Sequence, residues 1–360
     1  MPYKYIAFMG GGARGVVYPG GYKALVDSGL YKGIEGISGC SIGAISSAII
    51  ASGSTPEQFR EISSKTNFSL LLGSRSRKTL LSGADGKPLL NFLREVIKNN
   101  ILSFFEGKNI FDIKDIGKSF TQNKKELETI FYKCKQNKSI TFKDLYILHK
   151  VAPYRFKNLS VNAVRKDTGE SKIFNYKNTP DVEVSIACLA SGALPGVIRP
   201  VKINGYEYVD GGLHDNLPSA PKYFKTHKKD QVKKSEILLM TLSRKEGPMY
   251  KALHSTPTSG DSLYSPSRKD ELKQYGIEHL GINLDYKVTD RKKSMYNKVR
   301  LNNSNAIELD ITGISTTDFK STNKRKDEYF YRGYFNTYDS LIKKRICKKP
   351  DNNYDLRKFF

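Results

Sequence analysis

The chain has 360 residues, 38% of them hydrophobic, which is enough for a sizeable core and excludes a wholly disordered protein. Its 60 Lys and Arg against 36 Asp and Glu give a formal net charge of +24, which favours anionic membranes or nucleic acids as partners, or a basic surface that is merely solvated. No run of 18 apolar residues and no basic-then-apolar leader occurs, so we expect a soluble or peripheral membrane protein without a spanning helix or a Sec signal.

The first 51 residues contain the same unit twice. Residues 3–9 form a short apolar run that ends in glycines, and residues 13–28 carry spaced apolar positions suited to a helix. Residues 34–38 then predict a second strand, followed by a glycine-flanked serine and the small, apolar segment 44–51. We therefore expect two consecutive units of strand, tight loop and helix.

The middle of the chain is less regular. A loop at 80–86 and an amphipathic helix at 88–99 indicate a helical insertion over residues 65–139. A β-hairpin is predicted from residues 158–165 and 171–176, and a helix from residues 182–191.

The second half begins with a strong turn signal, because Asn204-Gly205 separates two short strands at 202–203 and 206–209. This hairpin delivers Asp210 at the end of a strand. Further strands are expected at 236–242 and 276–284, a long surface loop at 243–268, and a basic terminal helix within 320–349. We predict a catalytic core over residues 1–217 and completion of the same domain by residues 218–360.

Residues 39–43, Gly39-Cys40-Ser41-Ile42-Gly43, match the pattern G-x-S-x-G. Glycines on both sides of the serine relieve crowding in a sharp turn and expose its hydroxyl. Such a pentapeptide occurs by chance in many chains. Its position between a predicted strand and a predicted helix favours a nucleophile elbow, with Ser41 at a helix N-terminus where negative charge is stabilised.

Residues 10–15, Gly-Gly-Gly-Ala-Arg-Gly, also match the dinucleotide pattern G-x-G-x-x-G, with Glu35 as a loose acidic partner. The serine elbow follows Glu35 within six residues, which disfavours a nucleotide fold. The alternative is an oxyanion hole, in which unobstructed backbone amides face the alkoxide of a tetrahedral intermediate.

A serine nucleophile needs a base, and neither the five histidines nor the four scattered cysteines form a distinctive cluster. We therefore expect free thiols and no metal site. A triad of Ser41, Asp210 and either His254 or His279 is one option. The other is direct proton transfer to Asp210, which Gly211 and Gly212 leave free to approach a neighbouring turn.

Taken in order, the glycine run, the serine pentapeptide and Asp210-Gly211-Gly212 resemble the three blocks of patatin-like phospholipases of the bacterial type. Residues 190–195 with Pro200 resemble a fourth block of the family. One difference is Ile198, which stands where the family commonly has an aromatic residue. The resemblance implies a Ser-Asp dyad of Ser41 and Asp210, without metal or cofactor. It also implies an oxyanion hole built from Gly10, Gly11, Gly12, Ala13, Arg14 and Gly15.

This resemblance, with the repeated strand–helix unit, predicts a three-layer α/β fold with a mostly parallel central sheet flanked by helices. The implied function is a phospholipase A or lysophospholipase that cleaves acyl-ester lipids on an anionic membrane surface. Some bacterial members of the family are delivered into host cells and activated there, so the resemblance implies for this chain a secreted effector with a protein activator. The rival hypotheses are a triad esterase for soluble substrates and an idle membrane- or nucleic-acid-binding protein, with nucleic acid disfavoured.

Overall fold

The structure is a computed structural model that describes residues 3–73, 83–106, 121–255, 268–284, 287–317 and 324–348. Its strands form one sheet in the order β5-β6-β3-β2-β1-β7-β8, and β4 also pairs with β3. The strands are β1 (Tyr5–Phe8), β2 (Gly36–Gly39), β3 (Asn158–Arg165), β4 (Ser171–Asn175), β5 (Val201–Ile203), β6 (Tyr206–Asp210), β7 (Ile237–Ser243) and β8 (Ala306–Asp310). The five strands from β3 to β8 in this order are parallel to one another. Strands β4 and β6 pair with β3 in the antiparallel sense, and β5 pairs with β6 in the same way.

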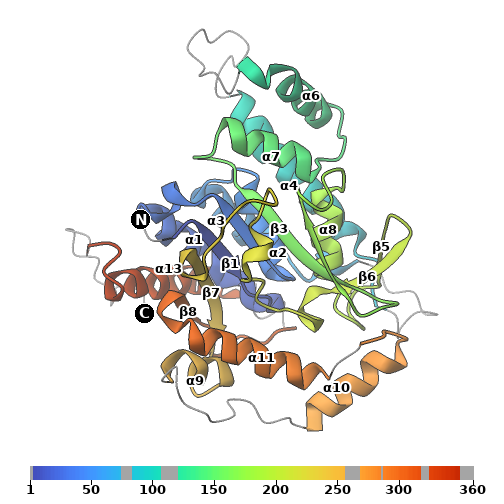
Figure 1. The fold of residues 1–360 in the computed structure, drawn as a ribbon, viewed down its shortest axis with the longest axis vertical. Helices are drawn as coiled ribbons and strands as arrows, with labels where there is room; N and C mark the ends of the chain where they lie inside the picture. The colour runs from blue at the N-terminus through green and yellow to red at the C-terminus, as the bar shows by residue number, and fades with distance from the viewer. Residues whose placement is uncertain are drawn as a thin grey trace.

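Helices pack around this sheet (Figure 1). They are α1 (Tyr18–Asp27), α2 (Ile42–Ala51), α3 (Pro56–Lys65), α4 (Lys87–Glu106), α6 (Lys124–Lys135), α7 (Phe142–Val151), α8 (Val184–Ser191), α9 (Pro248–His254), α10 (Arg268–His279), α11 (Val288–Leu301) and α13 (Lys326–Lys343). Helix α13 lies along α1 and contacts β8, while α2 and α8 pack on β2 and β3. The predicted α/β fold with a mostly parallel central sheet is confirmed.

Strand β1 lies inside the sheet, with a parallel neighbour on each side. Strands in that position are buried on both faces and read as continuous apolar runs, which explains Ile6, Ala7 and Phe8. Strands β7 and β8 come from residues beyond 217, so both parts of the chain build the same sheet.

The helix predicted over residues 13–28 divides into a 3₁₀ segment, η1 (Gly12–Val17), and α1. Pro19 lies in the first turn of α1, where its missing N–H is tolerated. Between β5 and β6, Asn204 and Gly205 have φ of 49° and 84°, as a two-residue hairpin turn requires. The turn signal in the sequence therefore identified this hairpin correctly.

The strand predicted at 276–284 is wrong, because α10 continues to His279 and a turn follows. The alternation of apolar and polar residues around Ile282 imitates strand periodicity. In the structure Ile277 and Ile282 instead pack on Val164 and Val209 of the sheet. One side chain from α10 and one from the turn after it therefore pack against the same apolar surface of the sheet.

The predicted loop at 243–268 is also partly wrong, because it contains α9, which begins at Pro248 and buries Met249 and Ala252. The rest of that segment, 256–267, lies outside the described residues. Within the predicted helical insertion, α4 and α6 are helices as expected, while 74–82 and 107–120 lie outside the described residues. No helix in the described ranges has the length and apolar character needed to cross a bilayer.

Candidate active site

Strand register explains how Ser41 and Asp210, 169 positions apart in the sequence, come together. On β3, Val161 pairs with Gly39 of β2, and Ala163 pairs with Asp210 of β6. Strand β4 pairs with residues of β3 that also pair with β2 or with β6. It therefore lies along one edge of β3, and β2 and β6 lie along the other. Since a strand has only two edges, β2 and β6 lie end to end on the same edge and run toward each other.

Ser41 stands in the turn between β2 and α2, with φ 54° and ψ −124°. A non-glycine residue at positive φ costs of the order of 1–3 kcal/mol and is held there by its surroundings. The close approach of neighbouring backbones requires the flanking glycines. A Cβ on Gly39 would lie 2.2 Å from the Gly43 carbonyl oxygen, and one on Gly43 would lie 2.5 Å from that of Phe8. The chain therefore makes a sharp turn at Ser41, and the assignment of this turn as a nucleophile elbow stays a prediction.

Asp210 is a buried carboxylate, with 4% of its surface exposed. Its Oδ1 accepts a 2.6 Å hydrogen bond from the Gly212 amide and lies 3.9 Å from the Cys40 Sγ. Burial raises the pKa of Asp210 to about 6, although hydrogen bonds from Gly212 and from the Ser41 hydroxyl oppose the rise. The Ser41 hydroxyl thus lies close enough to the Asp210 carboxylate to influence its pKa.

The glycine run forms the loop between β1 and α1 beside the serine. A Cβ on Gly10 would lie 3.2 Å from the Cβ of Ser41, so the loop passes close to that side chain. Gly12 has φ of +59°. Within the described part of the chain, the Gly11 and Gly12 amides donate to no backbone carbonyl. Two amides beside a serine can stabilise an oxyanion.

Residues from the end of the chain hold this loop in place. The Ala13 amide donates to the Thr316 carbonyl at 2.9 Å, and the Arg14 Nε donates to the Ile314 carbonyl at 3.2 Å. Desolvation, and then the charge of Arg244, lower the pKa of Arg14. The sequence pattern contained no signal for these contacts, because they span about 300 positions.

The sequence interpretation also missed three polar residues that support the site. The Ser191 hydroxyl accepts from the Ser41 amide at 2.9 Å. Asn216 holds Gly10 by two hydrogen bonds. The Gly10 amide donates to the Asn216 carbonyl at 2.9 Å, and the Asn216 Nδ2 donates to the Gly10 carbonyl at 3.0 Å. Asn162 donates to the Gly211 carbonyl at 3.2 Å. Ser191 lies in the fourth block noted above, and Asn216 follows Asp210 by six residues in a short loop.

Neither candidate triad histidine lies with Ser41 and Asp210. The His254 Nε2 lies 2.8 Å from the Glu308 Oε2 beside β8. His279, at the end of α10, does not line the cavity that contains Ser41 and Asp210, whereas His214 does. Neither histidine named in the sequence is brought to the serine.

A cavity of about 650 Å³ opens over Ser41 and Asp210. Its lining combines apolar side chains with cationic side chains from η1, α10 and α11. The apolar wall includes Ile42, Ile45, Phe68, Leu71, Leu72, Leu89, Leu194, Val197 and Ile198, and the cationic wall includes Arg14, Lys273, Arg291 and Lys292. A cavity with both kinds of lining side chain suits an amphipathic ligand.

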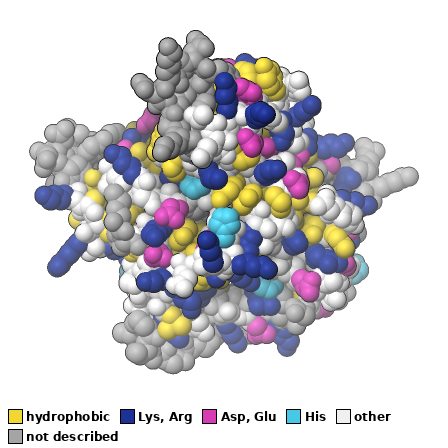
Figure 2. Space-filling model, turned by 45° about the horizontal axis from the view of Figure 1, so that its top comes forward, with side chains coloured by type: hydrophobic (Ala, Val, Ile, Leu, Met, Phe, Trp, Pro, Cys, Tyr) yellow, Lys and Arg dark blue, Asp and Glu magenta, His cyan; other side chains and the backbone are white. Residues whose placement is uncertain are grey.

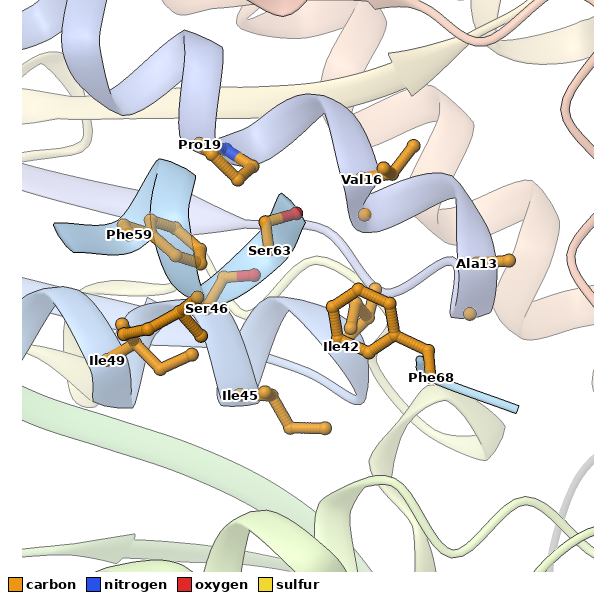
Figure 3. A pocket seen from close by; sticks show the side chains of 13 residues that line it. Ala13, Val16, Pro19, Ile42, Ile45, Ser46, Ile49, Phe59, Ser63 and Phe68 are labelled. Carbon is orange, nitrogen blue, oxygen red and sulfur yellow. The ribbon is translucent and has the colours of Figure 1, made fainter. Parts of the chain in front are cut away.

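A narrower apolar pocket of about 30 Å³ borders this cavity, and Ile42, Ile45 and Phe68 line both spaces. In Figure 3 its walls come from α2, from η1 and the start of α1, and from α3, with Phe59 and Ser63 at the α3 side. Of the remaining predicted site residues, Ala13 and Gly15 line this pocket. The sequence did not reveal it, because its walls meet only after α3 packs on α1.

A family model described as patatin-like phospholipase matches residues 6–221, which is more than half of the chain. The chain belongs to the patatin-like phospholipase family. The matched region of this patatin-like chain contains Ser41, Asp210 and the glycine loop, whereas α10 and α11 lie outside it.

This patatin-like chain is also similar to the probable lipid hydrolase 463L of Invertebrate iridescent virus 6. The two are 30% identical over 242 residues, which is 66% of this chain and 69% of the viral protein.

Among solved structures, VipD from Legionella pneumophila matches with a TM-score of 0.65 and 18% identity, over 95% of this chain and 67% of VipD. ExoU of Pseudomonas aeruginosa, solved in complex with SpcU, matches with a TM-score of 0.56 and 19% identity. That match covers 95% of this patatin-like chain but only 53% of ExoU. At such identities, the likeness shows a shared fold.

Proposed function

We propose that this chain hydrolyses acyl esters of glycerophospholipids or lysophospholipids through a Ser41-Asp210 dyad. The observation that carries the proposal is the position of Ser41, which stands on a turn at positive φ and shares one cavity with the buried carboxylate of Asp210. The amides of Gly11 and Gly12, which bond no backbone carbonyl among the described residues, complete the set of groups that acyl transfer needs.

In the proposed reaction, Asp210 accepts the Ser41 proton as the Ser41 Oγ attacks the ester carbonyl carbon. The amides of Gly11 and Gly12 stabilise the resulting oxyanion, an interaction worth roughly 10²–10³ in rate per donor. When the carbon–oxygen bond breaks, protonated Asp210 returns the proton to the leaving alcohol. Water then attacks the acyl-enzyme by the same route and releases the fatty acid.

A pKa of about 6 suits Asp210 to this role. The carboxylate is ionised at neutral pH, and it is a stronger base than an exposed aspartate. The same burial that raises the pKa also excludes water from the proton-transfer path.

The cavity supports a lipid substrate because its apolar side can bury acyl methylenes, each worth about 0.8 kcal/mol. On the face shown in Figure 2, Lys and Arg are spread among acidic and apolar side chains. The net charge of +24 would concentrate such a surface on anionic lipid. A protein activator and delivery into host cells stay predictions.

Mixed vesicles and lipid mass spectrometry test the proposal directly. The wild-type chain, incubated with vesicles of phosphatidylglycerol and phosphatidylcholine, is expected to release free fatty acid and lysolipid. Ser41→Ala should release neither. Wild-type protein that binds the vesicles but leaves every lipid intact, with or without host-cell extract, would contradict the proposal. The rival hypothesis of a membrane-binding protein without catalytic activity would then hold.

The narrow pocket beside Ile42 leads to a further prediction, on acyl-chain length. We propose that the chain of the bound ester runs along Ile42 and Ile45 and ends against Phe59 and Ser63. Ser63→Phe fills that end, so the ratio of kcat/KM for a long-chain over a short-chain ester should fall about tenfold, the loss of roughly two buried methylenes. Hydrolysis of a matched ester series measures this ratio.

Ser64→Phe is the matched control, because Ser64 is the next residue on α3 and is exposed. It should leave the ratio unchanged. Overpacking costs about 1–3 kcal/mol, so thermal unfolding is followed for both variants, and Ser63→Leu provides a milder filling. Equal loss of activity on short and long esters would contradict the pocket assignment.

A further inference from the structure

Four cationic side chains line the catalytic cavity. Arg14 comes from η1, Lys273 from α10, and Arg291 and Lys292 from α11. The helices α10 and α11 lie outside residues 6–221, the region that matches the family model, so three of these four charges come from outside that region. Figure 1 shows both helices along one side of the molecule, far from α6 and α7.

Two of these four cations lack an acidic partner among the described residues. Lys292 forms an ion pair with Asp270, which is buried. Arg14 and Lys273 form no ion pair with any carboxylate among the described residues. Asp210 is the acidic side chain in the cavity lining, and it accepts a hydrogen bond from the Gly212 amide.

The cations therefore repel one another across the cavity. Desolvation lowers the pKa of Lys273, and the charges of Lys292 and Arg14 lower it further, while Asp270 and Asp210 act in the opposite direction. Like charges held close together cost free energy, and a bound anion reduces that cost. The arrangement is preorganised for an anion near the nucleophile.

We propose that Arg14, Lys273 and Lys292 form an anion subsite that binds the phosphate of a phospholipid head group, and that this site selects anionic over zwitterionic head groups. This inference rests on the proposed function. When an acyl ester lies at Ser41, the glycerol backbone places the phosphate only a few bonds away, toward the cationic wall. A quaternary ammonium group brought to the same wall would be repelled.

The test uses phosphatidylglycerol and phosphatidylcholine with identical acyl chains, each diluted in neutral detergent micelles so that surface charge plays little part. Wild-type protein should favour phosphatidylglycerol in kcat/KM. Lys273→Gln should reduce that preference by about 10–100-fold, the worth of a charge-assisted hydrogen bond. Lys273→Arg should restore most of it. Lys143→Gln is the matched control, because Lys143 is exposed on α7.

A second readout does not depend on phospholipid hydrolysis. Glycerol 3-phosphate should inhibit hydrolysis of a neutral short-chain ester by wild-type protein and should inhibit Lys273→Gln at least tenfold more weakly. Equal effects of Lys273→Gln on both lipids, or a matching effect of Lys143→Gln, would overturn the subsite. If instead wild-type protein hydrolyses the neutral ester but neither phospholipid, the proposed function fails while the inhibition still reports on the anion site.

Discussion

Ser41→Ala is expected to lower kcat for acyl-ester hydrolysis by about 10⁴–10⁶-fold, because removal of a nucleophile leaves only the oxyanion hole and substrate binding to accelerate the reaction. The methyl group of alanine at this position meets the same backbone strain as serine does at φ 54°. The fold should therefore persist. Steady-state kinetics on a chromogenic ester and covalent labelling by a fluorophosphonate probe measure the effect.

Ser64→Ala is the matched control, since Ser64 is an exposed serine on α3. It should keep wild-type kinetics and full labelling. Labelling of Ser41→Ala at the wild-type rate would place the reactive serine elsewhere. A variant that also loses its cooperative thermal transition would have lost its fold, so unfolding is recorded beside the kinetics.

Asp210→Asn is the second large effect, with an expected loss of about 10⁴ in kcat, because the amide cannot accept the Ser41 proton. In the wild-type chain, kcat/KM should rise with pH and level off above about 6, as the base ionises. The residual activity of Asp210→Asn should lack this step. A pH–rate profile from pH 4 to 9 measures both.

The same substitution should stabilise the fold at neutral pH. Burial raises the Asp210 pKa from 3.8 to about 6, so the folded chain binds more protons than the unfolded chain between these values. The contribution of Asp210 to stability is therefore lost as pH rises through this window. Replacing the buried charge by asparagine should recover up to about 3 kcal/mol at pH 7. Urea unfolding at pH 4 and pH 7 compares the two chains.

The histidine variants separate the dyad from a triad. His254→Ala and His279→Ala, alone and together, should keep kcat within about twofold, because neither side chain lines the cavity. His214→Ala removes an imidazole from the cavity wall and should change KM more than kcat. A 10⁴-fold loss in any of these variants, with an active Asp210→Asn, would make a histidine the base.

Much of the site could be predicted because its geometry is local. The positive φ at Ser41, the close approach at Gly39 and Gly43, and the turn at Asn204 and Gly205 each follow from the steric demands of a few adjacent residues. Apolar runs likewise marked the inner strands, since β1 is buried on both faces. Residues 276–284 have a pattern that fits either a strand or the end of a helix. Packing of Ile277 and Ile282 against the sheet accompanies the helical end of α10 and the turn after it.

The sequence by itself determined the elbow, the glycine loop and the family, because short-range sterics and residue spacing encode them. Only the tertiary structure decided that Asp210 meets Ser41. That contact depends on β2 and β6 sharing one edge of β3, and the raised pKa of Asp210 depends on the burial that results. The support from Ile314 and Thr316, and the cations of α10 and α11, likewise depend on packing between segments far apart in the chain, which no local pattern specifies.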